Sequence, residues 1–549
     1  LERLATDASG SSDGAAAPTE TDALRRQVNE RLAAIYLARG LHQKAIEKLT
    51  FLAAAQEGST GQPGQPAVFR ALGEAYQQSG EAANAAYFLE RSLKLLRPDP
   101  SGAEEPNEAA RELRTQERLL TLLSFGRYHL NRDGLEDAAK TARLVLEAAQ
   151  PPEAHREACS RARLLLGEVA ARSGEHALAL KESQEAQVLA EAEGSQTLLL
   201  EVSASLGWSC LGLGNYDQAL QHFERGLELA KALDSKFDAA SFQSCIGTLH
   251  HNRADHQRAL QCFTQSLFLS SQIGDLKGIA NSYNNLGAVH RLKDDLDRAQ
   301  DCYKRATDIF SRINDQQGMA TGMSNLSSIL EHGGKYTEAL DYAFRALDKR
   351  KKSRSHSGIA SSYYRIGKIY QAKGEIEKAI NYAEKSLQIR AEVGERLGIA
   401  YSRLLLAEVA LIQGRYADAL QLCEAGLREF LELDNEVGAL LTQEALARAQ
   451  LGAGDLDGAR GILEQVLERS GKRQQTNLAG SCRLQLARAF SLYGEPQKAE
   501  RLLREAERVF RSLQSKREVA EVLLELGGLH IARVQTQEAS ACLEEAYTI

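Results

Sequence analysis

The chain of 549 residues is too long for one ordinary globular core, and its many helix formers with only 9 prolines favour an all-α protein. Its formal net charge of -7 argues against a general nucleic-acid binder, because such proteins usually carry a basic surface. No apolar run reaches the roughly 18 residues of a membrane-spanning helix, and the 8 scattered cysteines contain no C-x-x-C pair. We therefore expect a cytoplasmic protein with no membrane contact, no metal and no cofactor.

The first part of the chain falls into three predicted segments. Residues 1–21 are rich in small polar residues and are predicted to be a disordered linker. Residues 22–96 are predicted to form two helical hairpins, the second marked by Gly80 and Ala85. Residues 97–110 contain several Pro, Gly and Ser residues, so we expect an exposed loop inserted at this point.

The remainder, residues 111–549, repeats with a period of 40 residues. A glycine five residues before most of the periodic alanines supports the same period. The alanines are Ala139, Ala179, Ala219, Ala259, Ala299, Ala339, Ala379, Ala419, Ala459, Ala499 and Ala539. Together with the two units upstream, this spacing predicts about thirteen repeats.

Each repeat has the pattern of two helices. Small and apolar residues recur at helical spacing up to Gly287, and again from Ala299 through Tyr303 to Ala306 after a short turn. The small residues would let two helices approach closely, and Tyr303 would fill the space between successive units. A single hairpin cannot bury its own apolar face, so neighbouring repeats must stack into a solenoid.

This pattern resembles the tetratricopeptide-repeat (TPR) family over residues 22–549. The residues that carry the resemblance are Tyr283, Leu286, Gly287, His290, Ala299, Tyr303 and Ala306. The 40-residue period is similar to the long-repeat branch with Pins/LGN-type adaptors, kinesin light chains, Rap-type peptide receptors and MalT-like sensors. The resemblance implies an all-α, right-handed superhelical solenoid whose first helices line a concave groove. The chain ends inside a second helix without a polar cap, so we expect a truncated last repeat followed by more protein.

The resemblance also implies which side chains face the groove. In the early repeats these positions are mostly apolar, as at Leu164 and Leu165, whereas from about Ser241 to Gln371 they are polar. An Asn amide both donates and accepts, so it can pair with a peptide backbone of any sequence. Arg365 and Lys368 add donors for a carboxylate. The predicted partner-binding residues are Ser244, Thr248, His251, Asn252, Asn281, Asn284, Asn285, Arg291, Asn325, Ser328, Tyr364, Arg365 and Lys368. The alternative is that these polar side chains only keep an exposed helix face soluble.

The sequence favours a function without catalysis. It contains no phosphate-binding loop, no G-x-S-x-G elbow and no H-E-x-x-H motif, and His250 and His290 occupy a packing position of the repeat instead of a metal site. We expect a non-enzymatic scaffold that holds a peptide or a partner protein in its concave groove. The alternative is a ligand-sensing domain that controls an attached effector domain. Nucleic-acid binding would need basic and stacking residues in most repeats.

Overall fold

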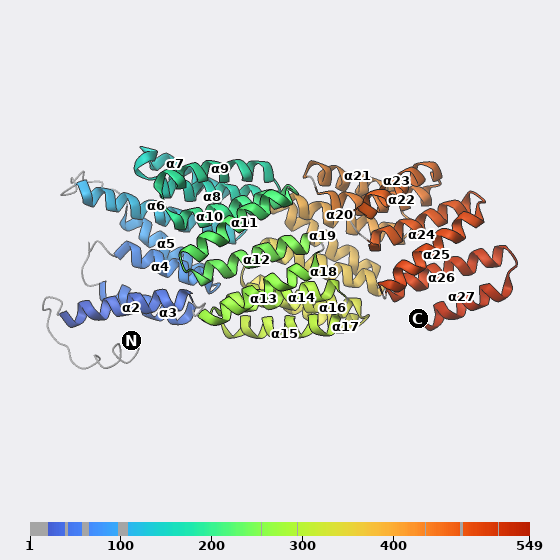
Figure 1. Cartoon of the computed structure of the whole chain (residues 1–549), viewed down its shortest axis with the longest axis horizontal. Helices are drawn as coiled ribbons and strands as arrows, with labels where there is room; N and C mark the ends of the chain where they lie inside the picture. The colour runs from blue at the N-terminus through green and yellow to red at the C-terminus, as the bar shows by residue number, and fades with distance from the viewer. Residues whose placement is uncertain are drawn as a thin grey trace. The chain divides into compact units, whose positions relative to one another are not determined.

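The structure is a computed structural model that describes residues 20–38, 42–56, 65–96, 108–253, 255–293, 295–433, 435–472, 476–513 and 515–549. These residues form helices and turns, without any β-strand, which confirms the all-α prediction (Figure 1). The chain divides into two compact units, Leu1–Ser362 and Tyr363–Ile549, which we call unit 1 and unit 2. The eight cysteines are free thiols.

Helices α2 to α27 pair in chain order into thirteen helix–turn–helix repeats, with α2 and α3 in repeat 1 and α26 and α27 in repeat 13. Unit 1 contains α2 (Glu20–Ala38), α3 (His42–Gln56), α4 (Gln65–Gln78), α5 (Ala82–Leu95), α6 (Glu108–Asn131), α7 (Leu135–Ala148), α8 (Arg156–Ser173), α9 (His176–Glu193), α10 (Gln196–Gly212), α11 (Tyr216–Ala232), α12 (Lys236–Asn252), α13 (His256–Ile273), α14 (Leu276–Leu292), α15 (Leu296–Arg312), α16 (Gln316–His332) and α17 (Tyr336–Lys352). A short 3-10 helix, η1 (Pro152–Ala154), precedes α8.

The boundary between the units falls inside α18 (His356–Lys373), in repeat 9. Unit 2 then contains α19 (Ile376–Val393), α20 (Arg396–Ile412), α21 (Tyr416–Glu432), α22 (Glu436–Ala453), α23 (Leu456–Lys472), α24 (Thr476–Leu492), α25 (Pro496–Ser512), α26 (Lys516–Ala532) and α27 (Thr536–Thr548).

Two predicted segments overlap helices at their ends. The last two residues of the predicted linker, residues 1–21, belong to α2, which begins at Glu20, and residues 1–19 lie outside the described residues. The last three residues of the predicted loop, residues 97–110, belong to α6, which begins at Glu108, and residues 97–107 are likewise not described. Both helices start within polar sequence, where the hydrophobic pattern gives no boundary signal.

Packing inside a repeat follows the small and large residues seen in the sequence. A Cβ atom built on Gly287 would lie 2.8 Å from the Tyr303 ring, so no larger residue fits there without movement. Tyr303 is 1% exposed, and Leu326 and Ile329 of the next repeat join it in one buried cluster. The predicted roles of Gly287 and Tyr303 are confirmed, because the tyrosine fills the space that the glycine leaves and links two repeats.

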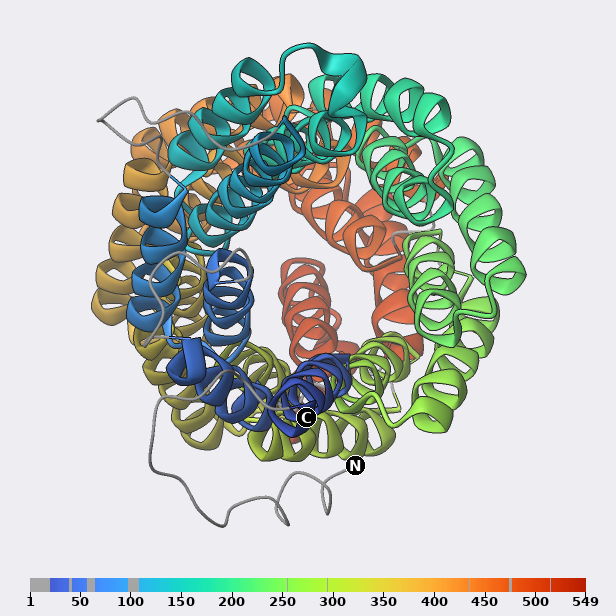
Figure 2. The ribbon, with the colours of Figure 1, turned by 90° about the vertical axis from the view of Figure 1, so that its left-hand side faces the viewer.

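In repeats 2 to 8 of unit 1 and repeats 10 to 13 of unit 2, the first helix lies on the inner side of its unit. The first helices from α4 to α16 in unit 1 contact one another in succession, and so do α20 to α26 in unit 2, whereas the second helices pack mainly against first helices. Figure 2 shows these inner and outer layers for α8 to α15, coloured teal to green. Closer spacing of the first helices makes their exposed side the concave surface of each unit, as repeat arrays generally show.

Candidate functional site

The thirteen predicted site residues lie on four first helices. Ser244, Thr248, His251 and Asn252 lie on α12; Asn281, Asn284, Asn285 and Arg291 on α14; Asn325 and Ser328 on α16; Tyr364, Arg365 and Lys368 on α18. The first ten belong to unit 1 and the last three to unit 2. The predicted groove therefore crosses the boundary between the units, and its two parts are described separately.

In unit 1 the Asn side chains form bonds between successive first helices. Asn285 Nδ2 donates to Ser244 Oγ at 3.1 Å, which joins α14 to α12. Asn325 Nδ2 donates to Asn284 Oδ1 at 2.7 Å, which joins α16 to α14. The structure therefore brings these four predicted residues together. We call the uncharged polar set on these three helices the amide surface: Ser244, Thr248, Asn281, Asn284, Asn285, Asn325 and Ser328.

The amide surface retains hydrogen-bonding capacity after these bonds. An Asn side chain has two N–H donors and an oxygen that can accept twice, and each bond above uses one N–H group. Asn281 is exposed, whereas Asn284, Asn285 and Asn325 are half-buried. Half-buried amides whose orientation is fixed by a neighbour can present their remaining donors and acceptors to a ligand with little loss of side-chain entropy.

Three predicted site residues lie at the carboxyl ends of α12 and α14 and do not belong to the amide surface: His251, Asn252 and Arg291. Asn252 and Arg291 are exposed, whereas His251 is half-buried. Burial, followed by the positive fields of His256 and Arg291, lowers the pKa of His251, so its ring is neutral at pH 7. His251 therefore acts as a polar but uncharged side chain.

The two histidines assigned to packing have local carboxylate neighbours. His250 Nδ1 lies 3.9 Å from Asp255 Oδ2, and His290 Nδ1 lies 3.6 Å from Asp295 Oδ2. Burial, the largest influence, lowers the pKa of both rings. Across the described residues, no group of three or more His, Cys, Asp or Glu side chains has a geometry that could hold a metal ion.

The predicted residues of unit 2 are engaged in contacts that the sequence did not reveal. Lys368 Nζ lies 3.1 Å from Glu408 Oε2, and Gln371 Nε2 donates to the same oxygen at 3.0 Å. The guanidinium of Arg390 lies 5.4 Å from the centre of the Tyr364 ring. Because Lys368 already pairs with Glu408, a partner carboxylate would have to compete for it.

A second candidate site, which sequence reasoning missed, lies on the first helices of repeats 2 to 5. A cavity of about 600 Å³ opens between α4, α6, α8 and α10. Its polar lining includes Arg70, Glu74, Ser124, Arg127, Arg161 and Glu201. We call these six residues, together with Glu117, the charged surface. Arg161 pairs with Glu201 at 3.3 Å, so here too the inner helices of successive repeats are bonded, but through ions.

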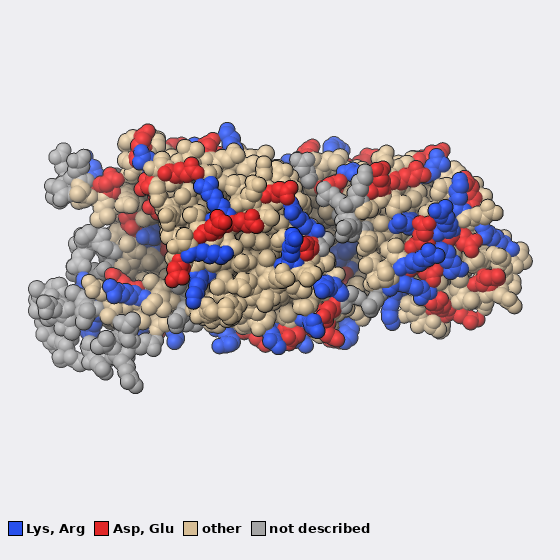
Figure 3. All heavy atoms as spheres, in the orientation of Figure 1, with Lys and Arg blue, Asp and Glu red and all other residues tan. Residues whose placement is uncertain are grey.

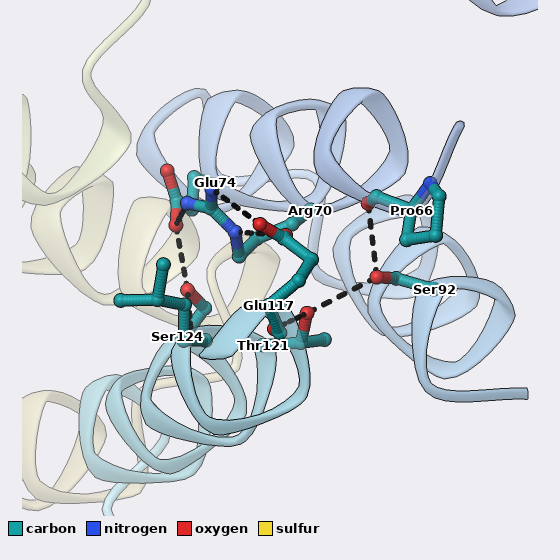
Figure 4. A network of polar contacts seen from close by, with 8 residues as sticks. Pro66, Arg70, Glu74, Ser92, Glu117, Thr121 and Ser124 are labelled. Carbon is teal, nitrogen blue, oxygen red and sulfur yellow. Dashed lines mark hydrogen bonds and ion pairs between the residues drawn. The ribbon is translucent and has the colours of Figure 1, made fainter. Parts of the chain in front are cut away.

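Arg70 is the centre of the charged surface (Figure 4). Its Nε atom lies 2.7 Å from Glu117 Oε1, and its Nη1 atom lies 3.2 Å from Glu74 Oε1. Ser124 Oγ donates to Glu74 Oε1 at 2.6 Å. Burial opposes the charge of Arg70, but Glu117 and Glu74 together hold the pKa of Arg70 above its ordinary value. The ion pairs are therefore satisfied within the chain.

A buried hydroxyl pair fixes the helix that carries Glu117. Ser92 Oγ donates to the Pro66 carbonyl at 2.9 Å and lies 3.1 Å from Thr121 Oγ1, as Figure 4 shows. Thr121 Oγ1 also lies 2.8 Å from the Glu117 carbonyl, to which it donates. These bonds tie α4, α5 and α6 together and position Glu117 for Arg70.

The charged surface was not predicted from the sequence, because the groove-facing positions implied by the family resemblance are mostly apolar in the early repeats, as at Leu164 and Leu165. The available signal was the Arg70/Glu74 pair, four residues apart on one helix face. The partner Glu117 lies beyond the 97–110 insertion, so the repeat spacing could not align it with Arg70.

The geometry defines the class of the protein as an α-solenoid of two-helix repeats whose inner helices carry polar side chains. The family model of the MalT-like TPR region matches residues 279–549, and that of the tetratricopeptide repeat matches residues 159–232 and 238–312. The chain belongs to the tetratricopeptide-repeat family.

Similar solved structures include other helical-repeat proteins. A Rap protein complexed with Competence and Sporulation Factor is 16% identical, covers 65% of this chain and 99% of its own, and has a TM-score of 0.48. The apo form of RapI is 18% identical, covers 50% and 99%, and has a TM-score of 0.41. A structure described as the nearly identical TPR-like repeats of a putative kinesin light chain from Podosopora anserina is 22% identical, covers 35% of this chain and 94% of its own, and has a TM-score of 0.29. No curated protein matches the chain.

Among the described helices, none combines the length and the apolar character that crossing a membrane requires.

Proposed function

We propose that this chain is a non-enzymatic scaffold, and that its amide surface binds an extended segment of a partner protein. The observation that carries the proposal is the pair of inter-repeat bonds, Asn285 to Ser244 and Asn325 to Asn284. These bonds orient uncharged donors and acceptors along three successive inner helices. Family membership supports an interaction role, since a solenoid offers a long concave surface for contacts.

An extended segment matches the chemistry of the amide surface. Its backbone offers one N–H and one C=O per residue, and Asn can pair with both whatever the side chains are. Ser244, Thr248 and Ser328 add hydroxyl oxygens as further acceptors, and the Thr248 hydroxyl already donates to the Ser244 carbonyl. Because the amide surface carries no formal charge, binding desolvates no ion. Affinity then depends on several modest hydrogen bonds and on the ordering cost of the segment, which gives a Kd of about 1 µM.

The experiment is affinity capture of partner proteins by the chain and by two double variants, read by mass spectrometry. Asn284→Ala/Asn325→Ala removes the bond between α14 and α16 and two orienting amides. Asn84→Ala/Asn381→Ala removes two exposed amides from second helices and serves as the matched control. We expect partners recovered by the parent and by the control to be lost from the first variant.

Circular dichroism must show that both variants retain the helical content of the parent. Equal recovery of every protein by all three chains would contradict the proposal. Loss of partners from both variants would also contradict it, because binding would then not depend on the inner helices of unit 1.

A further inference from the structure

Within unit 1, repeats 1 to 3 lie beside repeats 7 and 8 and the first residues of α18. His42 in repeat 1 lies near Lys277 and Asp315, at the starts of α14 and α16. A Cβ atom built on Gly80 in repeat 2 would lie 3.9 Å from Gln316 Cγ in repeat 8. Figures 1 and 2 both show the blue helices α2 and α3 next to the yellow-green helices of repeats 7 and 8. The chain of unit 1 therefore returns, after about six repeats, to lie beside its first repeats.

The third of these contacts is made by Asp133, in the turn between α6 and α7. Its Oδ2 atom accepts the backbone N–H of Ser357 at 2.7 Å and lies 3.4 Å from Ser355 Oγ, more than 200 residues along the chain. Ser357 is in the first turn of α18, where backbone N–H groups have no acceptor within the helix and negative charge is favoured. Arg172 Nη1 lies 4.0 Å from Asp133 Oδ1 and donates to the Leu130 carbonyl at 2.9 Å, which supports the turn.

The turn of repeat 3 places a residue other than glycine in the left-handed conformation, as does Val534 in the corresponding turn of repeat 13, with φ 60°. Asp133 adopts a left-handed φ of 62°, while Gly134 beside it has φ -80°. In the corresponding turn of repeat 4 a glycine, Gly174, takes the left-handed conformation, with φ 87°. A glycine at position 133 would adopt the left-handed conformation at lower cost than Asp133. Residues held in unfavourable backbone conformations often mark functional positions. In repeat 3 the unfavourable conformation coincides with the carboxylate that reaches repeat 9.

The contact region is polar and incompletely packed. A cavity of about 340 Å³ lies among Gln78, Asn131, Asp133, Lys277, Gln317 and other residues of these repeats. At repeat 1, by contrast, His42 is 4% exposed, and burial, then Lys277, lowers the pKa of His42 to about 4. A polar, partly hollow contact made through single side chains can separate at lower cost than a packed apolar core.

The contacts involve the helices that carry the amide surface. Lys277 and Asn281 are four residues apart on α14, so they share a helix face, and Gln316 begins α16, which carries Asn325. Repeats 1 to 3 therefore contact the starts of two helices that carry the amide surface, α14 and α16.

We propose that Asp133 latches repeats 1 to 3 onto the later part of unit 1, namely repeats 7 and 8 and the first turn of α18, and that opening of this latch gives a partner segment sideways access to the amide surface. The access part rests on the proposed function, whereas the latch itself does not. When the latch is closed, the N–H of Ser357 and the first turns of α14 and α16 are protected by repeats 1 to 3. When it opens, all three become accessible to solvent.

Hydrogen–deuterium exchange of the full chain tests the latch without any ligand. Asp133→Gly removes the carboxylate and relieves the left-handed backbone. The matched control is Asp234→Gly, which changes an exposed aspartate that also has a positive φ, of 50°. We expect exchange to accelerate at least about tenfold at Ser357 and measurably in the first turns of α14 and α16, because a charge-assisted hydrogen bond is lost. The control should match the parent.

Unchanged exchange at Ser357 would overturn the proposal. Acceleration at Ser357 alone would also overturn it, because Asp133 would then be a local cap of α18 that does not hold the repeats together. Neither outcome touches the partner-binding proposal, since no partner takes part. Conversely, failure of the capture experiment would leave the exchange result standing.

Discussion

The amide surface and the charged surface occupy equivalent inner helices of unit 1, yet they use polar side chains differently. In the charged surface, Arg70 and Arg161 find their counter-ions on neighbouring helices, at 2.7 Å and 3.3 Å. In the amide surface, Asn285 and Asn325 use one N–H each and retain further donors and acceptors. Under the proposed function, the polar inner face serves the fold in one part of unit 1 and binds a partner in another.

The two surfaces should respond differently when a polar side chain is removed. Removing one member of a half-buried ion pair leaves its counter-ion unpaired in a poorly solvated place, which costs stability. Removing an exposed amide leaves no unpaired group in the free protein, so the cost appears only when the partner is bound. Substitutions on the charged surface should therefore change stability, whereas replacing an exposed amide such as Asn281 should change affinity alone.

The largest expected effect is that of Arg70→Ala. It leaves Glu117 and Glu74 without their common counter-ion, and we expect a loss of about 1–3 kcal/mol in the free energy of unfolding. Arg127→Ala changes another arginine of the same cavity, whose side chain is 62% exposed and 3.7 Å from Glu201, and should cost less than about 0.5 kcal/mol. Urea denaturation followed by circular dichroism measures both. Equal losses of unfolding free energy in the two variants would mean that burial of an ion pair in this cavity does not determine its contribution to stability.

Unit 2 allows a sharper comparison, because two carboxylates on its inner helices have opposite pKa shifts. Burial favours the neutral form of Glu408, but Lys368 and Gln371 outweigh it and lower the pKa of Glu408. Burial raises the pKa of Glu444, against the smaller effects of Arg448 and Ser481. We expect Glu408→Gln to cost about 1 kcal/mol at pH 7, whereas Glu444→Gln should be neutral or stabilising, since it removes a poorly compensated charge.

The pH dependence of these two carboxylates also has opposite signs. A lowered pKa means that Glu408 contributes stability above its ordinary pKa of 4.5 and loses it as the pH falls through the folded value. A raised pKa means that Glu444 contributes stability below 4.5 and loses it as the pH rises through its folded value. Unfolding measured from pH 3 to pH 8 should therefore show a shallower acid-side slope for Glu408→Gln. The same slope in the parent and in both variants would contradict these assignments.

The third effect is on binding alone. Asn281 is exposed on α14, so Asn281→Ala should change the free energy of unfolding by less than about 0.5 kcal/mol. If Asn281 contacts the partner backbone, affinity should fall about fivefold, the equivalent of about one hydrogen bond. Isothermal calorimetry with a partner identified by capture measures this change. If Asn281→Ala lowers the free energy of unfolding but leaves the affinity unchanged, Asn281 stabilises the fold and does not contact the partner.

The sequence predicted the parts of this architecture that repeat. The spacing of the alanines, with Gly287 facing Tyr303, predicted the helix pairs and their close packing, because backbone approach demands small residues at regular intervals. The positions of Asn284 and Asn325 on inner helices could be inferred, but their mutual bond could not, since it depends on how two repeats are rotated. Asp133 and Arg70 were missed because their partners lie beyond an insertion or six repeats away, where periodicity carries no information.

Ion pairs and ion-free recognition also respond differently to salt. Raising the salt concentration from 0.1 M to 1 M shortens the screening length from about 10 Å to about 3 Å, which weakens exposed charge interactions. Figure 3 shows acidic and basic side chains intermingled over α25 and α26, where Arg511, whose side chain is 45% exposed, lies 2.8 Å from Glu507. Ion pairs of this kind should weaken slightly, whereas partner affinity at the amide surface should change less than about twofold. A several-fold loss of affinity in salt would mean that recognition depends on charged residues such as Arg365 or Arg291, and the amide surface would then be structural.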